Sequence, residues 1–147
     1  MNEQFGRSDE TAEATTLGSG RVKCAIALES FSEALGEILG AMVPVSWRPS
    51  TTVAAYNDLS EVIRMVEDRL PVLLVIHTNL LFFGPEDWIA SCSAANPNMR
   101  FLFVTGWVQE QIDYLLKMNE PFHMPMTALG LPFEREQFAA ALEAALR

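Results

Sequence analysis

Short apolar runs alternate with helical patterns from Arg21 to the end of the chain. A continuous apolar run is typical of a buried strand, and apolar residues recurring every three to four positions are typical of an amphipathic helix. Residues 72–76 give the strongest strand signal, because all are apolar and most are β-branched, as in a central parallel strand covered on both faces. The expected strands are residues 22–28, 43–47, 72–76, 100–105 and 124–129, with residues 49–56 as a loop.

The helical segments carry start signals. Ser30 with Glu33, and Asp58 with Glu61, have the spacing of capping boxes, in which each side chain pairs with a backbone N–H of the other residue. Pro85 suits a first helical position, and acidic residues follow it. We expect helices at residues 30–42, 58–70, 85–95, 108–118 and 134–147, with Pro121 ending the fourth. The residues expected to point inward from the fourth helix are Val108, Ile112, Leu115 and Leu116.

Five strand–helix units in strict alternation predict a parallel sheet with helices on both faces and right-handed crossovers. For five such units we expect the flavodoxin-like α/β fold, a doubly wound (βα)5 sheet with strand order 2-1-3-4-5. This order places the second and fifth strands at the edges. Pro44 and Pro125 fall in those two strands, and proline within a sheet is tolerated mainly at edges.

The composition fits one soluble domain with an added arm. The chain has 147 residues, the usual size of a single domain. Residues 1–20 are polar and acidic, so we expect a flexible arm there and a folded domain over residues 21–147. A net charge of −9 argues against binding to nucleic acid or to an anionic membrane surface.

No leader or membrane segment is expected. The first residues lack the basic start and apolar run of a signal peptide, and no apolar stretch is long enough to span a bilayer. A cytoplasmic protein follows as the default. Cys24 and Cys92 fit that compartment as unpaired structural thiols, with a disulfide or redox pair as the alternative.

Three stretches, in this order, resemble the receiver domain of two-component response regulators over residues 21–147. Residues 57–71 resemble the family's second helix and the proline before its third strand. Residues 101–106, reading Phe-Leu-Phe-Val-Thr-Gly, resemble a fourth strand ending in Thr and a small residue. Residues 131–133, reading Leu-Pro-Phe, resemble the family's Lys-Pro-Phe turn.

The resemblance implies a pocket that has lost most of its phosphoryl-transfer groups. Of the family's acidic pair after the first strand, only Glu29 remains as an acid, and one carboxylate makes a poor Mg²⁺ site. His77 stands where the family has its nucleophilic Asp, Thr105 is retained, and Leu131 stands in place of the Lys. Phosphoryl transfer needs a metal and a cation to neutralise its oxygens, so we expect no catalysis, no metal and no cofactor.

Each of these residues has alternative interpretations. His77 is either a partly buried histidine bonded to a loop backbone, a pH switch, or a metal or phosphoryl ligand. Glu29 is either a remnant of the acidic pocket or a solvated residue, and Thr105 is either a phosphoryl contact or simply a β-branched strand end. The resemblance also implies a cis peptide bond before Pro132. His123 adds no zinc signature, because its spacing to the other candidates is unrelated to that of metal ligands.

The apolar segment 79–83 follows His77 and either fills the vacated pocket or forms an exposed binding patch. Trp88 and Trp107 lie near the same end of the sheet, as core residues or as binding hot spots.

Loss of the catalytic groups leads to the hypothesis of a phosphorylation-independent interaction module in bacterial signalling. The alternative is a small-ligand sensor that uses the vacated pocket, whereas no motif supports an enzyme.

Partner binding is expected on the fourth helix, fifth strand and fifth helix, either with another signalling protein or with a second copy as a homodimer. The candidate surface residues are Trp107, Ile112, Leu116 and Phe133.

Overall fold

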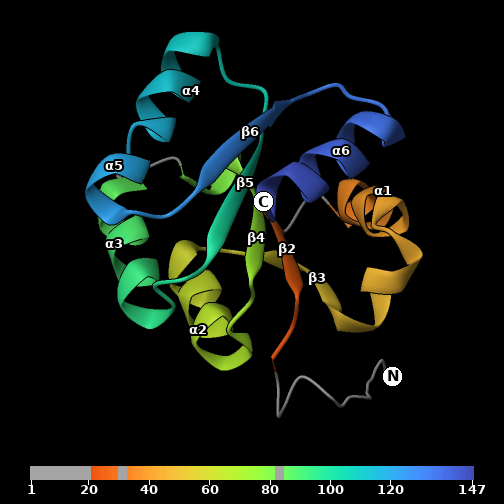
Figure 1. The fold of residues 1–147 in the computed structure, drawn as a ribbon, viewed down its shortest axis with the longest axis horizontal. Helices are drawn as coiled ribbons and strands as arrows, with labels where there is room; N and C mark the ends of the chain where they lie inside the picture. Colours follow the sequence, from red (N-terminus) through yellow and green to blue (C-terminus); the bar gives the residue numbers. More distant parts are fainter. Residues whose placement is uncertain (1–20, 30–32, 82–84) are drawn as a thin grey trace.

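The computed structural model describes residues 21–29, 33–81 and 85–147 (Figure 1). Its centre is a five-stranded parallel sheet in the order β3-β2-β4-β5-β6. Counted along the chain, this is the predicted order 2-1-3-4-5. The strands are β2 (Cys24–Glu29), β3 (Thr51–Tyr56), β4 (Leu73–His77), β5 (Arg100–Thr105) and β6 (Met126–Gly130).

Helices cover both faces of the sheet, and each face has its own core (Figure 1). One face carries α1 (Glu33–Met42) and α6 (Arg135–Ala145), and the other carries α2 (Leu59–Arg69), α3 (Pro85–Ala95), α4 (Gln109–Leu116) and α5 (Asn119–Phe122). Two 3-10 helices, η1 (Val45–Ser50) and η2 (Thr78–Leu81), complete the described elements. The stacked pair Phe101 and Phe103 fills the core beneath α3, whereas Phe138 anchors α6 on the opposite face.

Several local signals are confirmed. The side chain of Asp58 accepts the backbone N–H of Glu61 at 3.1 Å, and the Glu61 carboxylate accepts the N–H of Asn57 at 2.7 Å, so the predicted start of α2 is correct. The strand at residues 100–105 is correct at both ends. The fifth strand lies at the predicted edge, although it begins at Met126 and not at residue 124, so Pro125 precedes it; the Pro125 carbonyl accepts the N–H of Phe101.

The predicted second strand at residues 43–47 is wrong. Pro44 leads instead into η1, where Trp47 is buried and Lys23 places its ammonium 4.3 Å from the centre of the indole ring. The second strand along the chain is β3, which occupies most of residues 49–56, the segment predicted as a loop. Its Thr-Thr-Val start is β-branched, and this preference for extended backbone outweighs the lack of a long apolar run. An edge strand needs only partial burial, so its pattern is weaker than that of β4.

Two further expectations are wrong in detail. Pro121 does not stop the fourth helix, which ends at Leu116; it lies in the first turn of α5, where its missing N–H costs little. In the first predicted helix, Ile38 recurs at helical spacing with Leu35 and Met42, which predicts an inward side chain, but Ile38 is half exposed. The predicted arm at residues 1–20, the capping residue Ser30 and Phe82 to Gly84 lie outside the described residues.

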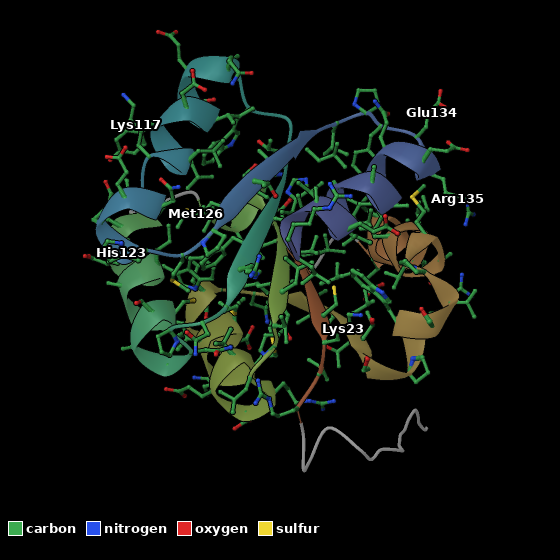
Figure 2. All side chains as sticks on the ribbon, viewed as in Figure 1. Lys23, Lys117, His123, Met126, Glu134 and Arg135 are labelled. Atoms are coloured by element: carbon green, nitrogen blue, oxygen red, sulfur yellow. The ribbon has the colours of Figure 1, made fainter. Side chains whose placement is uncertain are left out.

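The end of α1 is held by arginines from two other segments. The helix has no basic residue in its own last turn. Arg48 of η1 donates to the carbonyl oxygens of Ala41 and Val43, at 2.9 and 3.2 Å, and Arg135 at the start of α6 donates to Ala41 at 3.3 Å. Figure 2 shows Arg135 beside α1. Cations at a helix C-terminus satisfy its free carbonyls and oppose its dipole.

Both cysteines are buried and unpaired, as predicted. Burial raises the pKa of the Cys24 thiol to about 12, a rise that the nearby Lys23 partly opposes. Burial alone raises the pKa of Cys92 to about 12. In the part of the chain that the structure describes, no helix is long and apolar enough to cross a bilayer.

Along β3, the backbone N–H and C=O groups of successive residues point alternately toward β2 and away from it, and proline substitution can test this. Lys23 donates its N–H to the carbonyl of Ser50 at 2.8 Å, so alternate residues from Ser50 onward, including Ala54, turn their backbone groups toward β2. We expect Ala54→Pro to lower the free energy of unfolding by about 1–3 kcal/mol more than Val53→Pro, because only Ala54 loses a bond to β2. Urea denaturation of both variants measures this, and equal losses would contradict the alternation.

Candidate functional site

The four predicted pocket residues lie at one end of the sheet. Glu29, His77 and Thr105 are the last residues of β2, β4 and β5, and Leu131 follows β6 directly. Because the strands are parallel and adjacent, their carboxyl ends meet along a single edge, where open α/β sheets bind ligands. The sequence therefore places these residues together correctly.

The turn η2 covers this end of the sheet. It begins directly after His77, and both Thr78 and Leu81 are fully buried in it. The Thr78 hydroxyl donates to the Thr105 hydroxyl at 2.9 Å, across two strands. The backbone N–H of Trp107 donates to the same Thr105 oxygen, also at 2.9 Å. Both lone pairs of the Thr105 hydroxyl therefore have partners from within the chain.

Glu29 is tied to the same turn. The Asn79 side-chain amide donates to the Glu29 carboxylate at 2.8 Å, and the Asn79 backbone N–H donates to Nδ1 of His77 at 3.1 Å. Asn79 thus bridges the ends of β2 and β4 with one residue. The group bonded to the Glu29 carboxylate is therefore a neutral amide.

His77 is mostly buried, and this burial lowers its pKa below the ordinary value of 6.5, because desolvation disfavours the charged imidazolium. The carboxylate of Glu29 acts in the opposite direction and is the smaller effect. Acceptance of a hydrogen bond at Nδ1 also requires that nitrogen to be unprotonated. The arrangement matches the predicted histidine bonded to a loop backbone.

Leu131 contributes packing and one backbone bond. Its side chain packs against the core beneath α1 and α6, and its N–H donates to the Thr105 carbonyl at 2.8 Å. The Leu131–Pro132 peptide bond is cis, as the resemblance implied. Phe133 then stacks on Phe138 with ring centroids 5.6 Å apart.

The predicted surface residues are only partly exposed. Trp107 and Leu116 pack against one core, Phe133 packs against the other, and Ile112 is half-buried. Val108, expected to point inward, is instead 63% exposed at the N-cap of α4.

Tyr114, which the sequence reading did not single out, is 53% exposed on the same helix. Its hydroxyl donates to the Glu86 carboxylate at the start of α3. This hydrogen bond lowers the pKa of Glu86 and raises the pKa of Tyr114, because it stabilises the carboxylate and the protonated phenol. The bond fixes an exposed aromatic ring between two helices.

Sequence reasoning missed the roles of Thr78 and Asn79. The signal was present, because these two polar residues follow His77 at the end of an apolar run, but the partners of a hydroxyl and an amide depend on the path of the turn. Of the apolar segment 79–83, Leu81 fills space beneath the turn and Leu80 packs against the adjacent core, while the next two residues lie outside the described part. Trp88 is core, in edge contact with Phe101. Within the described residues, no group of three His, Cys, Asp or Glu side chains could hold a metal ion.

The structure is similar to solved receiver domains. No protein-family model and no curated protein matches the sequence. The signal receiver domain of an HD domain-containing protein from Pseudomonas fluorescens Pf-5 has a TM-score of 0.64 at 18% identity, covering 86% of this chain and 95% of that one. The CheY-like response regulator receiver domain from Methanospirillum hungatei JF-1 has a TM-score of 0.63 at 10% identity, covering 85% and 94%.

A third similar structure is described as a pilus assembly-related protein, from Burkholderia pseudomallei K96243. Its TM-score is 0.61 at 17% identity, covering 90% of this chain and 95% of that one. At these identities the likeness shows the fold alone. The chain therefore has the fold of CheY-like receiver domains, and its chemistry must be argued from its own residues.

The lowered pKa of His77 predicts a pH dependence of stability. The unfolded histidine takes up a proton below about pH 6.5, whereas the folded one does so only at lower pH. We expect the free energy of unfolding to be highest above pH 6.5 and to fall as the pH drops from there through the folded pKa. Urea denaturation across this range measures the effect, and the proton resonances of His77 report its folded pKa.

The matched control is His77→Gln, which keeps a hydrogen-bonding side chain that does not titrate. In this variant the fall near pH 6 should be smaller than in the wild type. An equal fall in both proteins would show that other groups produce it.

Proposed function

We propose that this domain is a receiver-like interaction module that works without phosphorylation and catalyses no reaction. The single observation that carries the proposal is the use of the Thr105 hydroxyl within the chain. In the predicted role this oxygen would contact a phosphoryl group, but Thr78 and the Trp107 N–H already occupy it. Thr105 is also only 1% exposed, so a phosphoryl group could reach its hydroxyl only by displacing the surrounding chain.

The charges around Thr105 support the same proposal. His77 stands in place of the carboxylate acceptor, and burial lowers its pKa, which disfavours the charged imidazolium. Glu29 is bonded to the Asn79 amide rather than paired with a second acid, and Leu131 brings no cation. A phosphoryl group on this edge would lack an attacking carboxylate, a metal and a balancing ammonium.

Packing favours an interaction module over the small-ligand sensor. Thr78, Leu81 and Thr105 are all about 99% or more buried, so the turn η2 leaves little room beside Thr105 for a metabolite. A fixed turn also gives the surrounding surface one conformation, which suits constant recognition of a partner.

The proposed partner surface is α4 with the neighbouring β6 and α6. Val108 and Tyr114 supply its exposed apolar groups, and the bond to Glu86 holds the tyrosine in place before any partner binds. Tyrosine is enriched among residues that dominate binding energy, and pre-ordering reduces the entropy cost of binding. Glu110 and Asp113 on α4, and Asp87 on α3, place three acidic side chains on this surface, beside one cation, Lys117, at the end of α4. We infer a signalling partner that presents apolar side chains flanked by Lys or Arg.

Phosphorylation is tested by incubating the protein with acetyl phosphate and Mg²⁺ and measuring its mass. We expect no phosphoryl adduct, because no carboxylate stands in place of His77. A receiver domain with an intact aspartate serves as the positive control. The proposal is wrong if a stable adduct forms on this domain, or if Mg²⁺ titration at millimolar concentration shifts its melting temperature.

The partner surface is tested by placing a photo-crosslinking phenylalanine analogue at position 114 in cells. We expect a crosslinked partner at this position, since the side chain lies at the centre of the proposed surface. The matched control is the same analogue at position 37 of α1, an exposed site on the face of the sheet opposite α4. Crosslinks of the same species at both positions, or at position 37 alone, would contradict the assignment of the surface.

A further inference from the structure

The turn η2 is held to the sheet by a hydrogen bond that only a neutral histidine can accept. The backbone N–H of Asn79 donates to Nδ1 of His77 at 3.1 Å. A backbone N–H can only donate, so this Nδ1 carries a lone pair and no proton. The imidazolium form has a proton on both ring nitrogens and cannot accept the bond. Protonation of His77 therefore removes one of the bonds that hold the turn.

Asn79 has a second bond, which the same proton weakens. Its side-chain amide donates to the Glu29 carboxylate at 2.8 Å. That carboxylate also acts on His77, because it opposes the fall in the pKa of the histidine. A charged imidazolium attracts a carboxylate more strongly than a neutral amide does, since hydrogen bonds between two charged groups are the stronger kind. Glu29 can then exchange its bond to Asn79 for an ion pair with His77.

Glu29 is the charged group that faces His77 in the described part of the chain. The neighbouring strand β5 places Val104 beside the histidine, and the turn η2 carries no charge. Alternation along β4 puts His77 on the face covered by α1 and α6. Residues 30–32 and 82–84 contain no titratable side chain. The charged residues in the first turns of α1 and α6 are exposed and do not contribute to the pKa of His77: Glu33, Glu37, Glu134, Arg135 and Glu136.

We propose that protonation of His77 releases the turn η2 from the end of the sheet, so that this edge is closed near neutral pH and opens in acid. In the closed state Asn79 bridges β4 and β2 through its two bonds. In the open state Glu29 pairs with the imidazolium and Asn79 turns to solvent. The bond from Thr78 to Thr105 then holds the turn alone among the side-chain bonds described for it.

The burial of His77 supports the proposal through thermodynamic linkage. Burial in the closed state lowers the pKa of His77 below 6.5, because desolvation disfavours the charged ring. The open state therefore binds the proton more tightly, and the proton in return favours the open state. Above pH 6.5 the opening equilibrium does not depend on this histidine. Below it, the equilibrium constant for opening rises by at most about tenfold for each pH unit, until the closed state is protonated as well.

The test is hydrogen exchange of backbone amides in the full chain, measured by NMR and divided by the intrinsic exchange rate at each pH. The imidazole resonances of His77 are recorded on the same samples. We expect the protection of the Asn79 amide to be constant above pH 6.5 and to fall by up to about tenfold for each pH unit below it. The amide of Ile76 in β4 should stay better protected throughout, which shows that the turn opens while the domain remains folded.

Two variants separate the switch from its surroundings. His77→Gln keeps a hydrogen-bond acceptor beside Asn79 but does not titrate, so its Asn79 protection should not depend on pH. Glu29→Gln keeps an acceptor for the Asn79 side chain and removes the charge that favours the imidazolium. We expect Glu29→Gln to shift the fall in protection to lower pH, together with the titration of His77. This second variant keeps the test decisive if His77→Gln does not fold.

Three results would overturn the proposal. The first is constant protection of Asn79 in the wild type while His77 titrates, the second is an equal pH dependence in His77→Gln, and the third is a shift to higher pH in Glu29→Gln. The switch needs no partner, so it does not rest on the proposed interaction surface. A failed crosslink at position 114 leaves the switch standing, and a flat exchange profile of Asn79 leaves the interaction module standing.

Discussion

The hydrogen bond between the hydroxyls of Thr78 and Thr105 determines how the carboxyl end of this sheet is built. A parallel sheet gathers its strand ends at one edge, and this edge is where the fold normally leaves room for a ligand. Here the bond draws the turn after β4 down onto the end of β5, with Leu81 packed beneath it. A buried hydroxyl without a partner would cost free energy, so each threonine makes the presence of the other favourable. The bridge from Asn79 to Glu29 extends this closure to β2.

The fold could be predicted largely because its strongest signals are local. The fully buried run of β4 and the capping pair of Asp58 and Glu61 specify their elements without help from distant residues. The strand β3 could not be found in this way, since an edge strand is only half-covered and its threonines and alanines carry a weak pattern. Residues 43–47 look more apolar than β3, but Val43 and Trp47 are buried as parts of a turn and a 3-10 helix, not as a strand.

The candidate site was predictable in position and less so in detail. Glu29, His77, Thr105 and Leu131 could be placed from the order of strands, because the ends of parallel strands must meet. Their hydrogen-bond partners could not, because Thr78 and Asn79 act through the path of a four-residue turn that no periodicity encodes. The exposure of Val108 was missed for a related reason: it stands at the N-cap, where the helical spacing that predicted an inward side chain has not yet begun.

The carbonyl of Ala41 joins parts of the molecule that are far apart in sequence. It accepts hydrogen bonds from Arg48, which leads into β3, and from Arg135, which begins α6. One oxygen atom therefore accepts hydrogen bonds from the segment before the edge strand β3 and from a helix of the proposed partner surface. If a bound protein displaced the start of α6, the Ala41 carbonyl would lose its bond to Arg135 and keep the bond to Arg48. Binding at the proposed partner surface would then change the hydrogen bonding at the C-terminal end of α1, which packs against β3 on the far edge of the sheet.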